Sequence, residues 1–117
     1  MNRHLALAAL VAVGTAGMLC AARADDVANE AVWKRYWTAI DAQRQCGNVA
    51  LTQAQLDAMV HVIDRKVNYQ VSAGRGHQLM NEASAAVSDL AFKHGCKSPE
   101  LGELLVLFNN DLAPALR

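Results

Sequence analysis

The chain has 117 residues, of which 11 are basic and 11 acidic, so its formal net charge at neutral pH is zero. This balance, with no long basic run, argues against nucleic acid as the main partner and gives no reason to expect an anionic membrane surface as a target. The length fits one domain, near the size at which a hydrophobic core alone supplies only about 3–5 kcal/mol.

The first residues have the three parts of a secretory signal peptide. Residues 1–4 form a short basic head, residues 5–22 are mostly apolar, and Ala22-Arg23-Ala24 fits the small-x-small rule of signal peptidase. We therefore predict a signal peptide over 1–24 that is cleaved after Ala24, and a single helical domain over 25–117. Arg3 and Arg23 leave with the signal peptide, so the mature chain carries a formal charge of −2. The predicted location is periplasmic or secreted.

Two other interpretations of the apolar segment place the protein on a membrane. A retained transmembrane anchor would need the whole run, which is about the minimum length for spanning and is interrupted by Gly14 and Gly17. A lipid anchor on Cys20 would need a small residue before it, where this chain has Leu19. We favour cleavage, and we expect no stable membrane insertion of the mature chain.

Cysteine usage agrees with export. Cys20 lies in the predicted signal peptide, which leaves Cys46 and Cys96 as an even pair in a small exported domain. Such a pair predicts one disulfide, and the alternative is two free buried thiols. The closed loop of about fifty residues would stabilise the fold by roughly 4 kcal/mol through loop-closure entropy.

Apolar residues at three- and four-residue spacing predict a first helix from about residue 27 to Cys46. Trp33, Tyr36, Trp37 and Ile40 fall on one face, which we interpret as core, with a ligand platform of the two tryptophans as the alternative. Gly47 supplies the left-handed position that closes a helix.

The next two predicted helices follow a capping signal and a pair of glycines. Thr52 and Gln55 form a capping box that begins a helix running to about residue 72. Gly74 and Gly76 lower helix preference, so we predict a turn over 72–76, with one helix bent through Gly74 as the alternative. A third helix is predicted over 77–94.

Gly95 ends that third helix, and Ser98-Pro99-Glu100 begins a fourth, which Pro114 is expected to end. No segment shows convincing strand alternation. The prediction is therefore all-α, a small four-helix up-down-up-down bundle with one disulfide. In that topology the ends of the first and third helices share a pole, so Cys46 and Cys96 can meet.

Few patterns in the chain point to chemistry. Asp57, His61 and Asp64 fall at i, i+4 and i+7 on one helical face and are weak candidates for a divalent metal, although a solvated polar face explains them better. No nucleophile elbow or haem attachment motif is present. We expect no catalytic residue, no cofactor and no enzyme activity.

The fourth predicted helix carries more apolar residues than one core stripe needs. Val106 and Leu107 extend its core face and are tentative partner-binding residues. The alternative is that the fourth helix is simply more central in the bundle. In layout alone, the chain is similar to periplasmic acid-stress chaperones and to immunity proteins of secreted cell-wall amidases, and no motif assigns it to either.

These observations predict a binding or accessory module with a protein-partner, inhibitory or chaperone-like role. The partner would be another protein or a second copy of the chain, bound through an apolar helix surface. The alternative function is a periplasmic carrier of a metal or small ligand.

Overall fold

The computed structural model describes the backbone of residues 5–117 and the side chains of residues 24–117. The signal peptide predicted over 1–24 lies almost entirely outside the described side chains, so its cleavage stays a prediction. Within the described range there are helices and no strands. The elements are α1 (Leu5–Cys46), α2 (Gln53–Lys66), α3 (Ala73–His94) and α4 (Pro99–Leu107), followed by a π-helical turn (Phe108–Leu112) and a 3-10 turn (Ala113–Leu116).

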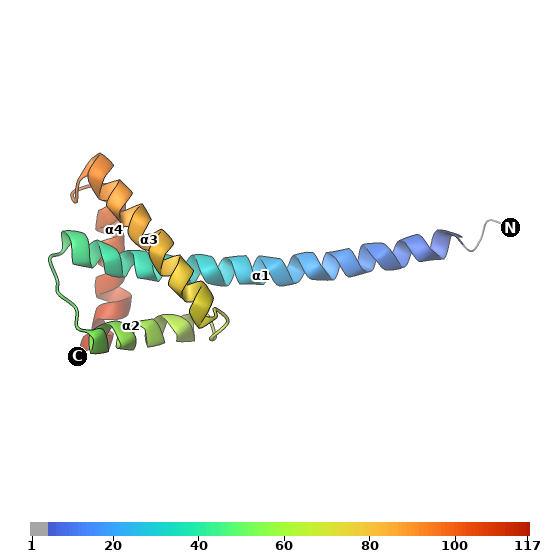
Figure 1. Ribbon diagram of the computed structural model, residues 1–117, viewed down its shortest axis with the longest axis horizontal. Helices are drawn as coiled ribbons and strands as arrows, with labels where there is room; N and C mark the ends of the chain where they lie inside the picture. Colours follow the sequence, from blue (N-terminus) through green and yellow to red (C-terminus); the bar gives the residue numbers. More distant parts are fainter. Residues whose placement is uncertain (1–4) are drawn as a thin grey trace.

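The C-terminal half of α1 is the centre of the domain. It contacts α2, α3 and α4, and α3 and α4 cross it on opposite sides (Figure 1). The chain reverses direction from α1 to α2, and the helices cross at wide angles rather than lying along one common axis (Figure 1). The predicted all-α class and the four helices are confirmed.

The predicted core face of α1 is confirmed. Trp33, Trp37 and Ile40 are buried, and the two indoles stack with their ring centroids 5.9 Å apart. The buried indole N–H of Trp37 has no acceptor among the described residues, which costs about 1–3 kcal/mol that the surrounding packing must offset. The other helices complete this core with Met59, Ile63, Val67, Leu79, Ala83, Val87, Leu101, Leu104, Phe108 and Leu112.

Three of the predicted helix ends are in place, but the left-handed position after α1 is taken by Asn48, with a φ of 52°, and not by Gly47. Thr52 accepts a hydrogen bond from the Gln55 backbone, and the Gln55 side chain accepts one from the Thr52 backbone, which completes the capping box of α2. Ser98 caps α4, with Pro99 as its first residue. Gly95 ends α3 with a φ of 72°, a left-handed value that favours glycine.

The turn between α2 and α3 was predicted too late in the chain. α2 ends at Lys66, and the backbone turns at Asn68 and Tyr69, which both have positive φ. Gly74 and Gly76 lie inside α3, which Ser72 caps. A Cβ at Gly76 would lie 3.2 Å from the Trp33 ring, so this glycine allows α3 to approach α1 closely.

The end of the fourth helix also differs from the prediction. α4 keeps α-helical hydrogen bonding only to Leu107, and the chain then continues through the π-helical and 3-10 turns. Pro114 lies within the 3-10 turn rather than ending the helix, because a proline is tolerated in the first turn of a helical segment. Phe108 and Leu112, in the π-helical turn, are buried in the core.

The predicted disulfide between Cys46 and Cys96 is confirmed, with their Cα atoms 5.4 Å apart. It joins the end of α1 to the loop between α3 and α4, so these two ends do lie at one pole of the domain.

The carboxylate of Asp41, on α1, is buried. It accepts a hydrogen bond from Ser84 on α3 and contacts Arg44. In the part of the chain that the structure describes, no helix is both long and apolar enough to cross a membrane.

Candidate functional site

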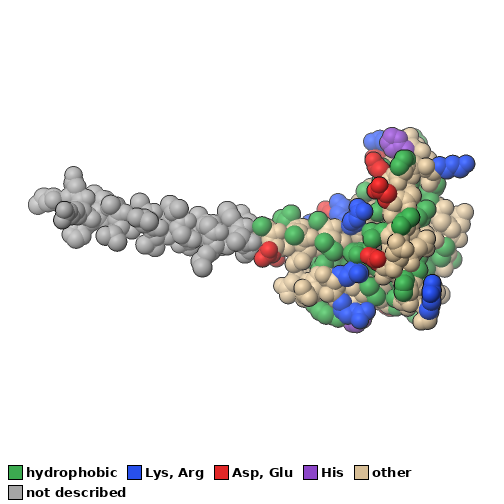
Figure 2. Space-filling view, turned by 180° about the vertical axis from the view of Figure 1, so that it is seen from behind, with side chains coloured by type: hydrophobic (Ala, Val, Ile, Leu, Met, Phe, Trp, Pro, Cys, Tyr) green, Lys and Arg blue, Asp and Glu red, His purple; other side chains and the backbone are tan. Residues whose placement is uncertain are grey.

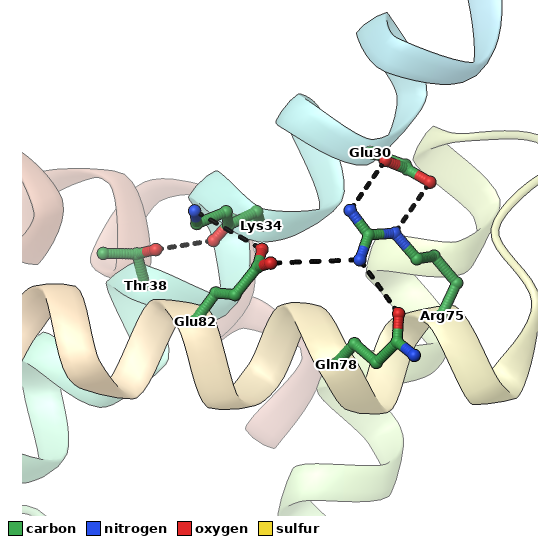
Figure 3. A network of polar contacts seen from close by, with 6 residues as sticks. All are labelled: Glu30, Lys34, Thr38, Arg75, Gln78 and Glu82. Carbon is green, nitrogen blue, oxygen red and sulfur yellow. Dashed lines mark hydrogen bonds and ion pairs between the residues drawn. The ribbon is translucent and has the colours of Figure 1, made fainter.

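A network of charged side chains fixes the start of α3 to α1. The Arg75 guanidinium binds both carboxylate oxygens of Glu30, with Nε–Oε1 at 2.9 Å and Nη2–Oε2 at 3.0 Å (Figure 3). Arg75 also donates to Gln78 and lies 3.9 Å from Glu82, which in turn pairs with Lys34 at 3.6 Å. Bidentate pairs of this kind fix orientation as well as contact.

The pairing between Arg75 and Glu30 affects both ionisations. The hydrogen bond from Arg75 lowers the pKa of Glu30, and the same bond raises the pKa of Arg75. Both groups are therefore charged over a wider pH range than usual. Lys34, one helical turn beyond Glu30, belongs to the same network through its pair with Glu82, and it also lines a cavity.

That cavity is an open groove between α1, α3 and α4, with a volume of about 530 Å³. We call it the α1–α4 groove. Its apolar lining consists of the buried Leu104, the half-buried Leu90 and the exposed Ala31. The remaining lining residues are polar or charged and come from α1 and α4: Lys34, Arg35, Thr38, Glu100 and Glu103.

The two edges of the α1–α4 groove carry opposite charge. Lys34 and Arg35 lie on the α1 side, and Glu100 and Glu103 lie on the α4 side. Among the described residues, Arg35, Glu100 and Glu103 form no ion pair, so the opposite edges are not joined to each other. The view from behind, in which α4 faces the reader, shows acidic and basic groups interspersed with apolar surface (Figure 2).

The two tentative partner-binding residues differ in how exposed their side chains are. The Val106 side chain on α4 is 57% exposed, and it follows Glu103 by one helical turn on the outer side of α4. Leu107 is half-buried and packs against the core. Val106 is therefore the more accessible of the two, and a substitution of Leu107 would disturb the core as well as the surface.

The three weak metal candidates are engaged elsewhere. Asp57 accepts a hydrogen bond from Gln53, and Asp64 accepts one from the Trp33 indole at 2.9 Å. His61 lies beside the Tyr69 ring, with the ring centroids 6.0 Å apart. No three His, Cys, Asp or Glu side chains within the described range are arranged to hold a metal ion. Asp64 is better explained as the acceptor that anchors Trp33.

A smaller and more enclosed cavity, of about 320 Å³, lies between α1, α2 and the start of α3. Trp33, Asp64, His77 and Met80 are among its lining residues. Its only charged group, Asp64, already accepts the Trp33 hydrogen bond. The lining of this cavity therefore carries fewer Lys, Arg, Asp and Glu side chains than that of the α1–α4 groove.

Tyr36 joins α1 to the C-terminal turn. Its hydroxyl donates to Asp111 at 2.6 Å, and Lys66 lies 5.1 Å from its ring centroid. Burial, followed by the hydrogen bond to Asp111 and the charge of that carboxylate, raises the pKa of Tyr36 from 10.0 to about 12.

We expect a pH titration to show the raised pKa of Tyr36 directly. Because the folded pKa of Tyr36 is raised, the neutral phenol stabilises the fold below about pH 10, and this contribution is lost as the pH rises towards about 12. Nuclear magnetic resonance of the tyrosine ring carbons should show Tyr36 titrating near 12. In Asp111→Asn the pKa should move back towards 10.0, and a wild-type midpoint already at 10 would contradict the assigned contact.

Sequence reasoning identified the helices that build the groove but did not predict the groove itself. Arg35 and Glu103 are 68 positions apart, and each alone is an ordinary exposed charge on an amphipathic helix. The surplus of apolar residues around Val106 was the one available signal, and it lies on α4, which is one of the helices that line the groove.

No protein-family model matches the chain, and neither curated proteins nor solved structures show a significant match to it.

Proposed function

We propose that the domain is an exported binding module that takes a protein segment into the α1–α4 groove. The observation that carries this proposal is the composition of the groove, an apolar lining between one basic and one acidic edge. Protein interfaces combine an apolar centre with a polar rim in this way. The edges would orient the bound segment, because each end of it must match one sign of charge.

The surroundings of the groove support a rigid binding surface. The bidentate Glu30–Arg75 pair and the Lys34–Glu82 pair fix the α1 edge to α3. The disulfide fixes the loop that leads into α4, which supplies the other edge. A preorganised surface loses less conformational entropy on binding than a mobile one.

Site-specific photo-crosslinking tests this function in the cell that makes the protein. A photoreactive phenylalanine at Ala31, an exposed residue that lines the groove, should give a covalent adduct with a protein. Ala85 is the matched control, since it is an exposed alanine on α3 that does not line the groove. Mass spectrometry of the adduct then identifies the partner and the residues joined.

The result has three informative outcomes. An adduct of fixed mass at Ala31 that is missing at Ala85 supports a protein-binding groove. Equal labelling at both positions, or no protein adduct at Ala31, contradicts it. A small-molecule adduct at Ala31 would replace the protein-binding proposal with a small-ligand carrier.

A further inference from the structure

We propose that the smaller cavity between α1, α2 and the start of α3 binds a primary alkylammonium group, with the Asp64 carboxylate as its counter-charge. We call this cavity, of about 320 Å³, the Asp64 cavity. It shares no lining residue with the α1–α4 groove, so this inference adds a second site to the proposed function. Its basis is a half-buried carboxylate that has no cationic partner among the described residues and lies in a mainly apolar lining.

The charge of Asp64 is not neutralised by any described side chain. Its Oδ1 atom accepts a hydrogen bond of 2.9 Å from the Trp33 indole, which is a neutral donor. Within the described range, no Lys, Arg or His forms an ion pair with Asp64. Arg75, which adjoins Gly76 of the cavity lining, binds Glu30 instead. A cation in contact with this carboxylate would therefore be attracted without displacing an existing ion pair.

Trp33 fixes the position of the carboxylate. The Trp33 side chain is only 2% exposed and stacks on Trp37, so it has little freedom to move. Its Nε1 atom donates to Asp64, and its neighbouring Cζ2 atom would lie 3.2 Å from a Cβ at Gly76. Asp64 and Gly76 therefore lie at the same edge of the indole. A group held in this way needs little reorganisation when a ligand binds.

The rest of the lining suits an alkyl chain. Val60 on α2, Val71 before α3 and Met80 on α3 provide apolar surface. An alkylammonium has the matching two parts, since its methylene stem packs on apolar surface while its charged end requires a polar partner. The cavity volume lies at the lower end of the range for ligand sites, about 300–1,000 Å³. A short stem is therefore the size that fits.

Other cations match the lining less well. A divalent metal ion requires several protein ligands, and no three His, Cys, Asp or Glu side chains in the described part of the chain are arranged to hold one. A guanidinium binds a carboxylate best through both oxygens, but Oδ1 of Asp64 already accepts the Trp33 hydrogen bond. An ammonium is a compact point charge that can use the second oxygen alone.

A nuclear magnetic resonance titration of the mature, unreduced protein with n-butylammonium tests this site. The indole N–H signal of Trp33 and the backbone amide signal of Gly76 should shift together. So small a ligand should bind with a Kd of about 1 mM, which is weak enough for it to be lost on purification. The uncharged isostere 1-butanol should bind at least about tenfold more weakly, because it cannot form the charge-assisted hydrogen bond.

The Asp64→Asn variant isolates the charge. Its side-chain carbonyl can still accept the Trp33 hydrogen bond, but affinity for butylammonium should fall about tenfold or more. Asp57→Asn is the matched control, because Asp57 is an exposed carboxylate on the same helix that does not line the cavity, and its affinity should be unchanged. Ala73→Leu provides a second test if Asp64→Asn fails to fold. Ala73 is an exposed lining residue, so a larger side chain there should weaken binding while Asp64 is kept.

A lysine derivative with an uncharged backbone, Nα-acetyl-lysine N-methylamide, distinguishes the two sources of an alkylammonium group. If it binds as butylammonium does, the site accepts a lysine side chain of a protein. If only butylammonium binds, the site takes a free amine, and both results support the inference. An absence of shifts at about 10 mM butylammonium, well above the expected Kd, would overturn it. Equal binding of 1-butanol, or unchanged affinity in a folded Asp64→Asn variant, would overturn it as well.

Discussion

Removal of the Cys46–Cys96 disulfide is expected to lower the free energy of unfolding by about 4 kcal/mol. The bond closes a loop with a sequence separation of 50 residues, and releasing it returns that loop's entropy to the unfolded chain. For a domain of this size the loss corresponds to a decrease in Tm of about 15–30 °C. Thermal and urea unfolding of Cys46→Ala/Cys96→Ala, compared with the unreduced wild type, measures it.

The double alanine variant contains no thiol that reductant could affect among the described residues. Adding reductant should therefore destabilise the wild type to the level of the variant and leave the variant unchanged. A variant within about 1 kcal/mol of the wild type would show that the loop is already constrained without the bond.

Trp33→Ala is expected to destabilise the domain by about 3–5 kcal/mol. Only 2% of the Trp33 side chain is exposed, and it stacks on Trp37, packs against Gly76 and donates to Asp64. The substitution therefore opens a cavity where α1, α2 and α3 meet. Denaturant unfolding followed by circular dichroism gives the change.

Trp33→Phe separates the hydrogen bond from the packing. It keeps an aromatic ring but removes the indole N–H, so it should cost about 1–3 kcal/mol by leaving Asp64 without its donor. Phe92→Ala is the exposed control: its side chain is 91% exposed, and its removal should change stability by less than about 0.5 kcal/mol. If Trp33→Ala cost no more than Phe92→Ala, the assigned core would be wrong.

The helix ends with explicit chemical signals were predictable from sequence. The Thr52 capping box, Gly95 and the Ser98-Pro99 pair are local, since the residues that satisfy the backbone lie within four positions of it. The turn at Asn68 was missed because two glycines lay a few residues further on. Gly74 and Gly76 looked like the turn, although the role of Gly76 is to admit the Trp33 ring from a distant part of the chain.

The candidate site was less predictable, because it too depends on contacts between residues that are distant in the sequence. The apolar spacing on the fourth helix identified Val106 as a surplus residue, but the α1–α4 groove depends on how α4 crosses α1. That crossing follows from side-chain packing between distant segments, which no local pattern encodes. Conversely, Asp57, His61 and Asp64 formed a local pattern without a shared site, because tertiary contacts assign Asp64 to Trp33.

Native mass spectrometry of the mature protein, purified unreduced from the cell that makes it, tests the central claim most directly. Our account predicts a disulfide-bonded chain that begins after Ala24 and is bound to protein, either as a dimer or with another partner. A monomer that carries a stoichiometric metal ion or small molecule would contradict it.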